Sequence, residues 1–468
     1  MYQSKLDELL TSIPINGNIT HCKDANCEKH LTSFQELNWR IIDACNRATK
    51  ATIPFSKPKT GEIPGWNEHV REKRDAAMFW HSRWIEAGRP RDAGWIAEMR
   101  RRTRARYHLA VREAKRDKDL IVKRRMAESL GNGDARHFWK NISKIKNNKN
   151  TVSAVIDNAR GQSACDAFKR KYSDLFNANP SGDMHMIKHE VNEDIRNRCC
   201  QDRARGNKEE HLHTITPEMI KKVISKIKKG QYDEHFKIFS ESIMYGCERL
   251  FVMLSLMLSC MLRHGYTVDS FTRVSIKPIP KDKKKSLSNS ENYRGIAPNA
   301  TIPKLLDYII LETFPQVFSS SDNQFAYKSK FSTTMCTFMV LETIQYYRDR
   351  GSPVYVTLLD SSKAFDYVRF DIMFNKLRRK GLCPLVIRLL MNIYSNSSYR
   401  ISWNGETSDY FTIKNGVKQG AVLSPILYTL YVESLLENVL NSGKGCHIGN
   451  NVASIFVYAD DIILLCPS

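Results

Sequence analysis

Aspartates stand at the ends of apolar runs in two widely separated segments of this sequence. Asp360 closes the run VYVTLLD, and Asp460 and Asp461 divide the segment ASIFVYADDIILLC into two apolar halves. Runs of this length predict strands, the first a buried strand that ends in a carboxylate and the second a hairpin with both acids at its tip. Adjacent carboxylates in apolar surroundings are costly unless their charge is compensated, and a divalent cation is the natural compensation.

These three acids indicate metal-assisted phosphoryl transfer. Two acidic strand ends could share two Mg²⁺ ions, or Mn²⁺ in their place, which would activate a hydroxyl for in-line attack on a nucleotide and stabilise the leaving pyrophosphate. An Asp-Asp pair alone is weak evidence, because aspartate is a favoured turn residue. The interpretation therefore depends on the segments that accompany the acids.

A glycine-bearing segment, NGVKQGAVLSP, lies between the two acidic segments. Gly416 and Gly420 permit a close approach of the backbone to another group, with Gln419 exposed on the turn and a helix beginning near Pro425. An ordinary glycine turn before a core helix is the alternative for this segment taken alone.

The segments LLDSSKAFD, NGVKQGAVLSPILYTLYV and FVYADD resemble, in this order, the central motifs of the reverse transcriptases of non-LTR (LINE-type, Jockey-like) retrotransposons. The resemblance implies an RNA-directed DNA polymerase that takes an RNA template, a DNA primer and deoxynucleoside triphosphates. It implies that Asp360, Asp460 and Asp461 are the catalytic residues and the metal ligands. It also implies that Phe365 is the aromatic gate that excludes a ribose 2′-hydroxyl.

Four further residues are assigned to the incoming nucleotide. In the family, the segment that contains Gln419 and Gly420 lines the nucleotide pocket. The segments KPIPK and NYRGI resemble the family's two fingers motifs, and from them we assign Lys281 and Arg294 to the triphosphate, since cations pair with phosphate oxygens. Exposed loop charges without a ligand are the alternative for these two cations.

The segment NQFAYKSKFSTT resembles a family segment that contacts the template. Gln324, Ser332 and Thr333 stand at its matching places and are assigned to the template. Ala326 and Lys330 replace positions that are commonly glycine, so the turn is strained if those sites require a positive φ.

Composition favours a polyanionic partner. Lys and Arg number 72 against 50 Asp and Glu, a formal charge of +22. The longest apolar run, residues 251–262, is shorter than the roughly 20 residues of a membrane span, and no signal or transit peptide is evident. The 12 scattered cysteines suit reduced thiols. We expect an intracellular protein, made in the cytoplasm and, by its family, acting in the nucleus; its oligomeric state is open.

Clusters of proline and glycine, together with changes in composition, divide the chain into four parts of an α+β protein. We expect a small unit over 1–65, a basic aromatic helical arm over 66–150, a polar linker over 151–215, and fingers with a partial palm over 216–468. Between Arg71 and Arg125 there are 18 basic and 8 acidic residues. The tryptophans of this arm are expected to form a core, and its arginines either to contact phosphates or to form a solvated face.

A compact cluster of His21, Cys22, Cys27 and His30 has the chemistry of metal ligands. The spacing C-x4-C-x2-H matches no standard zinc pattern. Ordinary packing of cysteine and histidine in a small turn is therefore favoured over a metal site.

The resemblance also implies a fragment, without the endonuclease and without the end of the palm and the thumb of such proteins. The first hypothesis is the RNA-directed DNA polymerase domain. The alternative is an inactive, truncated remnant that binds nucleic acid. A maturase or telomerase-like relative fits the segments before the polymerase motifs less well.

Overall fold

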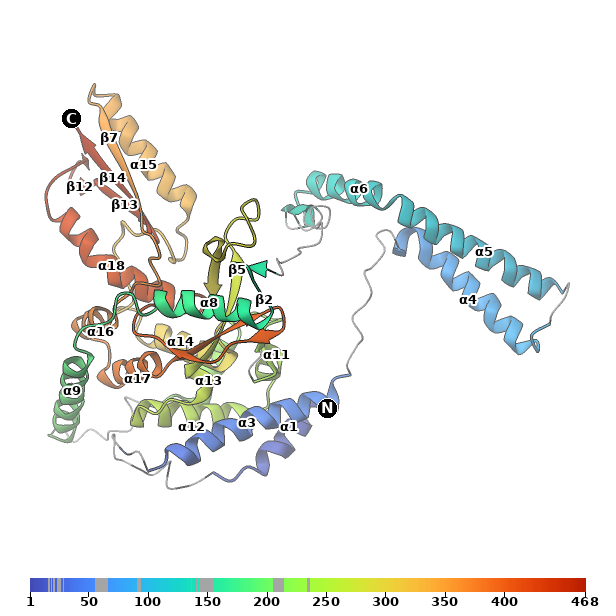
Figure 1. Ribbon diagram of the computed structural model, residues 1–468, viewed down its shortest axis with the longest axis horizontal. Coiled ribbons are helices and arrows are strands. Elements are labelled where there is room, and N and C mark those ends of the chain that lie inside the picture. The colour runs from blue at the N-terminus through green and yellow to red at the C-terminus, as the bar shows by residue number, and fades with distance from the viewer. Residues whose placement is uncertain are drawn as a thin grey trace. The chain divides into compact units, whose positions relative to one another are not determined.

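The computed structural model shows an α+β protein (Figure 1). Among the described residues, none of the helices combines the length and the apolar character that a membrane span requires. Contacts divide the chain into two units, Met1–Ile53 with Ser153–Ser468, and Pro54–Val152. The structure describes residues 1–54, 66–142, 155–204 and 214–468, except 16, 18, 20, 21, 23–26, 28, 91–93, 136, 140, 141, 234 and 235.

The smaller unit is helical and holds its aromatic side chains in a half-exposed seam. Its described elements are η1 (Trp66–Val70), α4 (Arg71–Glu86), α5 (Trp95–Arg116) and α6 (Lys118–Gly131). Trp80 meets Trp95 edge-on at 5.1 Å, and the Arg100 guanidinium lies 3.9 Å from the Trp84 ring centre. Trp95 is 65% exposed and α4 buries no residue. The expected tryptophan core is therefore wrong, because two helices in a hairpin cover only one side of each ring.

N-terminal helices of the larger unit pack against a helix from the middle of the chain. α1 (Tyr2–Thr11) and α3 (Leu31–Thr52) lie against the apolar α12 (Glu248–His264), and all three contribute to one hydrophobic core. Figure 1 shows them side by side. Residues 1–53 are thus part of the larger unit, which differs from the separate small unit expected over 1–65.

The region expected as a polar linker contains two helices, α8 (Gln162–Leu175) and α9 (Met184–Ala204), after the hairpin β1 (Val155–Ile156) and β2 (Ala159–Arg160). Phe168 of α8 is fully buried, with its ring 5.2 Å from Tyr293 and 5.0 Å from Trp403. The linker assignment is wrong for α8, because its buried aromatic residues recur at helical spacing beneath a polar composition.

A mixed sheet lies under α8, in the order β10-β8-β5-β6 with β9 paired to β8. β5 runs parallel to β8, whereas the other pairs are antiparallel. Buried and partly buried residues alternate along β8, as expected for a strand with one face in the core. The strands are β5 (Arg273–Pro280), β6 (Tyr293–Ile296), β8 (Ser398–Trp403), β9 (Glu406–Thr407) and β10 (Phe411–Thr412).

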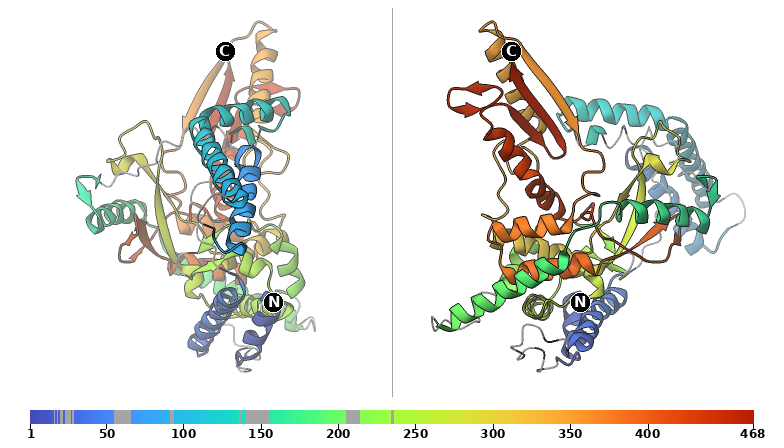
Figure 2. Two further views of the ribbon diagram at one scale, coloured as in Figure 1. Left: turned by 90° about the vertical axis from the view of Figure 1, so that its right-hand side faces the viewer. Right: turned by 60° about the vertical axis from the view of Figure 1, so that its left-hand side comes forward.

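A second sheet, here called the acidic sheet, consists of β7 (Val354–Asp360), β13 (Ile455–Tyr458) and β14 (Asp461–Pro467) in the order β13-β14-β7. α15 (Thr333–Arg348) and α18 (Ser424–Leu440) pack on it, through buried clusters centred on β13 and β14 (Figure 2). β7 is the edge strand and is exposed, with Leu358 72% and Tyr355 67% exposed. The expectation that β7 is buried is therefore wrong.

Shorter elements complete the larger unit. They are α10 (Pro217–Ile224), β3 (Tyr232–Asp233), β4 (Ile238–Phe239), α11 (Ser240–Met244), α13 (Asp269–Thr272), η3 (Ser290–Asn292), α14 (Thr301–Thr313), α16 (Phe370–Arg379), α17 (Pro384–Ser395), β11 (His447–Ile448) and β12 (Asn451–Val452).

Candidate active site

The acidic sheet brings the predicted catalytic acids to one end. Asp360 is the last residue of β7 and pairs in register with Asp461, the first residue of β14. Directly paired residues of antiparallel strands share a face, and like charges there repel unless they are compensated. Asp460 lies in the adjoining turn, although the three carboxylates do not all lie within 4.8 Å of one another. The strand ends thus offer oxygen ligands of the kind that a hard divalent cation prefers.

The turn that carries Asp460 is strained. Tyr458 pairs with Asp461, so the β13–β14 hairpin turns through only Ala459 and Asp460. Ala459 has a φ of +60°, a conformation that residues with a Cβ adopt at a cost. Such strain persists only where the surrounding structure enforces it.

Gln324 enforces this turn. Its Oε1 accepts a hydrogen bond from the backbone N–H of Ala459 at 3.0 Å, and its Nε2 donates to the Ala459 carbonyl at 3.4 Å. The Gln324 side chain is 1% exposed, and its Oε1 also accepts from the Ala326 N–H at 3.0 Å. The Gln324 amide is therefore enclosed by the acidic hairpin, where it positions the turn. Its assignment to the template stays a prediction.

The segment after Asn323 supports the same hairpin. Backbone hydrogen bonds join Val457 to Asn323 and Phe325, and the Asn323 side chain donates to the Ile455 carbonyl at 2.8 Å. The strand β13 is thus held on the side away from β14. The β13–β14 hairpin is therefore supported by residues 323–325 along β13 and by helix α18.

The other residues predicted for the template lie at the start of α15. Ser332 caps this helix by accepting the Met335 N–H at 3.2 Å, and both Ser332 and Thr333 are exposed. Their accessibility suits a contact with nucleic acid, which stays a prediction. Nearby, Lys330 has the expected positive φ of +68°, whereas the second positive φ falls on Tyr327 at +60° and not on Ala326.

Both predicted glycines of the segment 415–425 are required by close approach. Gly416 has a φ of +92°, and a Cβ there would lie 2.8 Å from the Asp366 carbonyl oxygen and from the Phe176 ring. Gly420 has a φ of +119°, and a Cβ would lie 3.0 Å from the Ala297 carbonyl oxygen. The close backbone approach expected from the sequence is confirmed.

A buried carboxylate links this segment to the turn after β7. Asp366 is 8% exposed, and its Oδ1 accepts a hydrogen bond from Gln419 Nε2 at 2.5 Å. Burial raises the pKa of Asp366 to about 6, whereas the hydrogen bond from Gln419 and the charges of Lys281, Lys363 and Arg294 oppose the rise. The structure therefore brings the predicted nucleotide residues Gln419, Lys281 and Arg294 around one acid.

Lys281 and Arg294 come from the β5–β6 hairpin, whose strands pair Ile279 with Arg294. Both cations are exposed, and Lys281 Nζ donates to the Glu291 carbonyl at 3.0 Å. The end of β6 is tied to the glycine segment, since the Ala297 N–H donates to the Gln419 carbonyl at 2.7 Å. This bond fixes the hairpin relative to Gln419.

Phe365 lies between the acids and the glycine segment. Its ring stacks on Tyr428 of α18 with centres 4.8 Å apart, and its carbonyl accepts the Val417 N–H at 2.9 Å. Burial raises the pKa of Tyr428 to about 12, and the nearby charge of Asp460 acts in the same direction. Phe365 is therefore fixed through both its main chain and its ring.

Two buried charged residues, Lys418 and Asp307, hold the far side of the glycine segment. Lys418 Nζ donates to the Phe271 carbonyl at 2.7 Å, and an Asp307 oxygen accepts the N–H groups of Val422 at 3.2 Å and Leu423 at 3.4 Å. Burial raises the pKa of Asp307 and lowers that of Lys418, and the charge of each partner opposes the other's shift. These hydrogen bonds to main-chain groups anchor the segment from within the core.

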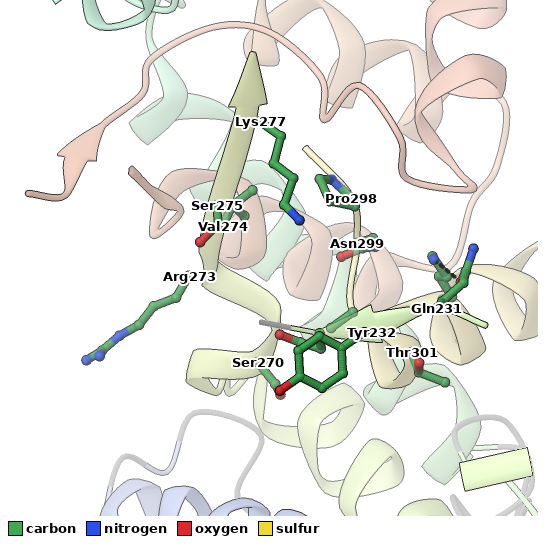
Figure 3. A pocket seen from close by; sticks show the side chains of 13 residues that line it. Gln231, Tyr232, Ser270, Arg273, Val274, Ser275, Lys277, Pro298, Asn299 and Thr301 are labelled. Atoms are coloured by element: carbon green, nitrogen blue, oxygen red, sulfur yellow. Dashed lines mark hydrogen bonds between the residues drawn. The ribbon is translucent and has the colours of Figure 1, made fainter. Parts of the chain in front are cut away.

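A pocket of about 240 Å³ lies away from the acids, between β5 and the turn before α14 (Figure 3). Lys277 extends into it from β5, beside Pro298 and Asn299. None of the three predicted catalytic aspartates lines this pocket. We therefore place the site at the strand ends and not in this cavity.

Several residues of the site were missed in the sequence. Asp366 and Lys418 lie inside the quoted motifs, and Asp307 is the single acid in the apolar run of α14 before Glu312. A lone charge among apolar residues is a signal, because such groups are rarely buried without a partner. The residues of the site that were missed are Asp307, Asp366, Asn415, Lys418 and Tyr428.

Comparison with known proteins shows what these elements resemble. Residues 279–468 match the family model described as reverse transcriptase (RNA-dependent DNA polymerase). The chain is 34% identical over 110 residues to the Pol polyprotein of the type-2 retrotransposable element R2DM of Drosophila melanogaster, covering 24% of this chain and 10% of that protein. It is 28% identical over 207 residues to a Pol polyprotein of the type-1 element R2 of Popillia japonica, covering 44% and 29%.

Further similarities extend over more of the chain. The RNA-directed DNA polymerase from the mobile element jockey of Drosophila funebris is 25% identical over 262 residues, which cover 54% of this chain and 28% of that protein. The chain spans less than a third of the length of these curated relatives. A solved apo telomerase from Candida tropicalis, truncated from its C-terminal domain, has a TM-score of 0.30 at 13% identity, over 53% of this chain and 61% of that one. A TM-score this low supports no argument.

Proposed function

We propose that this chain copies the RNA of a non-LTR retrotransposon into DNA, because residues 279–468 match the reverse-transcriptase family model and the similar proteins belong to such elements. The match agrees with the resemblance of the sequence motifs to this family. The observation that carries the proposed activity is the in-register pair Asp360 and Asp461 beside Asp460 in the strained turn.

Divalent metal ions serve this family, and the acids at the strand ends have the ligand chemistry for them. We propose two Mg²⁺ ions, with Mn²⁺ as a substitute, held by Asp360, Asp460 and Asp461. Such ions, when bound, lower the pKa of an attacking hydroxyl and neutralise charge on a leaving pyrophosphate. The like charges paired across the two strands support this assignment.

The chain's own residues hold the nucleotide in this proposal. Lys281 and Arg294 pair with the triphosphate, since charge-assisted hydrogen bonds to phosphate are strong and directional. The hydrogen bond to Asp366 keeps the Gln419 side chain oriented in the nucleotide pocket. Gly420, which has no side chain, leaves room there for the base pair. Phe365, locked on Tyr428, lies against the sugar and excludes a 2′-hydroxyl. The exposed Ser332 and Thr333 contact the template.

Primer extension tests the proposed activity. The chain is given an RNA template with an annealed DNA primer and deoxynucleotides in Mg²⁺, and is compared with a variant that carries Asp460→Asn and Asp461→Asn. Asp409→Asn is the matched control, because the Asp409 side chain is 96% exposed and lies on the β9–β10 turn. We expect extension by the wild type and the control, and none by the double variant. Equal extension by the double variant, or none by the wild type, would overturn the proposal.

A further inference from the structure

Three soft metal ligands meet in the segment between α1 and α3. The Sγ atoms of Cys22 and Cys27 and a ring nitrogen of His30 all lie within 4.8 Å of one another. In the part of the chain that the structure describes, this is the one group of three or more Cys, His, Asp or Glu side chains so close together. His21, the fourth member of the cluster in the sequence, lies outside the described residues.

The distances suit a tetrahedral zinc site. Zn–S bonds of about 2.3 Å and Zn–N bonds of about 2.0–2.1 Å place a sulfur and a nitrogen ligand about 3.6 Å apart. Cys27 Sγ and His30 Nδ1 are 3.5 Å apart. A thiol donating to the imidazole would give a similar distance, but it accounts for only two of the three groups.

The segment that carries these ligands is anchored on the core. The Tyr266 hydroxyl donates a hydrogen bond to the Cys27 carbonyl, and the Tyr266 ring lies 5.7 Å from Phe34 and 5.1 Å from His264. Cys27 itself is 7% exposed. The ligand cluster thus lies where the start of α3 meets the end of α12.

Ile19 fixes the segment at a second point. Its side chain is 2% exposed, and its carbonyl accepts the Cys260 thiol of α12 at 3.9 Å. Ile19 and Cys27 are therefore each held by a contact that does not need a metal. A ligand held in place in this way lowers the entropic cost of binding an ion.

We propose that Cys22, Cys27 and His30 bind a structural zinc ion, which cross-links Cys22 and Cys27 to the start of α3. Two thiolates and one imidazole select zinc over the hard cations that carboxylates prefer. The site is separate from the catalytic acids in both location and donor type. In this proposal the zinc ion and the N-terminal helices stabilise the larger unit. Polymerase chemistry does not require this role.

Metal analysis of the full chain tests this site. The wild type, purified without added metal, should retain one zinc per chain, and a variant with Cys22→Ser and Cys27→Ser should lose it. Cys466→Ser is the control, since Cys466 is exposed and distant in the fold, on β14. The variant with Asp460→Asn and Asp461→Asn should keep its zinc, which separates this site from the catalytic one.

Cobalt substitution gives a readout that does not depend on the variant folding. Wild-type chain loaded with Co²⁺ should show the near-ultraviolet charge-transfer absorption of thiolate ligands and the visible bands of tetrahedral cobalt. Absence of both bands, no zinc in the wild type, or full zinc retention by the folded Cys22→Ser, Cys27→Ser variant would overturn the proposal.

Discussion

The β13–β14 turn and the glycine segment 415–423 flank the same site but are held in different ways. The turn carries exposed or half-exposed acids on a strained backbone, and the side chain of Gln324 grips both the N–H and the carbonyl of Ala459. The glycine segment is held at many points, among them the fully buried Asn415, which donates to the carbonyls of Leu175 at 3.1 Å and Asp366 at 2.6 Å.

This difference matches what the proposed function asks of each region. A surface that shapes a base pair needs fixed geometry, because small misplacements reduce rate strongly. Carboxylates that are to receive ions from solution must stay accessible, so in this proposal their position is controlled through the main chain beneath them. The four predictions that follow test whether the glycine segment is held by many contacts and the β13–β14 turn mainly by Gln324.

The largest effect is expected from Gly416→Ala in the glycine segment. The new Cβ would meet the Asp366 carbonyl at 2.8 Å at a φ of +92°, so we expect a loss of about 3–4 kcal/mol in the free energy of unfolding. Urea denaturation measures it. The control is Gly443→Ala, which has a φ of +65° with nothing within 4 Å and should lose only about 1 kcal/mol. Equal losses in unfolding free energy for the two variants would show that the close contacts around Gly416 do not add to the cost of a side chain there.

Asp366→Asn should make the protein more stable at neutral pH. A carboxyl whose folded pKa is raised from 3.8 to about 6 contributes most to stability below its unfolded pKa, and this contribution is lost as pH rises through about 6. The variant should therefore exceed the wild type by up to about 3 kcal/mol at pH 7 and match it near pH 4. Denaturation across pH measures the gap, and a pH-independent gap would contradict the assignment. Activity should fall, because a neutral amide at this position no longer balances the cations around the nucleotide.

Gln324→Ala should slow extension about 10–100-fold at saturating template, since a buried Ala459 N–H left unpaired costs about 1–3 kcal/mol. Single-turnover extension measures the rate. In an Ala459→Gly background the loss should shrink, because glycine adopts a positive φ without strain. A weaker affinity of the Gln324→Ala variant for template, with an unchanged rate, would instead support the predicted template contact of Gln324.

The smallest effect is expected from Phe365→Val, which opens space beside the sugar while the main chain stays tied to Val417. Discrimination against ribonucleotides should fall about tenfold, with turnover of deoxynucleotides nearly unchanged. Competing incorporation of matched ribo- and deoxynucleotides measures the ratio. Unaltered discrimination in an active enzyme would remove Phe365 from the role of gate.

The acids and the glycines were predictable because their signals are local. Strand runs that end in aspartate, and glycines beside a helix start, reflect backbone rules that act over a few residues. The pairing of Asp360 with Asp461 comes from the structure, because two strands about 100 residues apart do not by themselves fix their register.

The anchors were not predictable, because each joins residues far apart in the chain. Gln324 reaches Ala459, and Asp366 reaches Gln419, through contacts that no local pattern encodes. The burial of α8 and the exposure of β7 were missed for the same reason, since composition does not show which neighbour covers an element.

The exposed edge strand β7 has a consequence for how the protein behaves at high concentration. Its run VYVTLL offers unpaired main-chain groups along one edge, without charge or proline until Asp360. Open apolar edges of this composition pair readily with the same strand of another molecule. We expect light scattering by the purified chain to rise steeply with concentration and to be suppressed by Val356→Lys, so colloidal stability depends on a single strand.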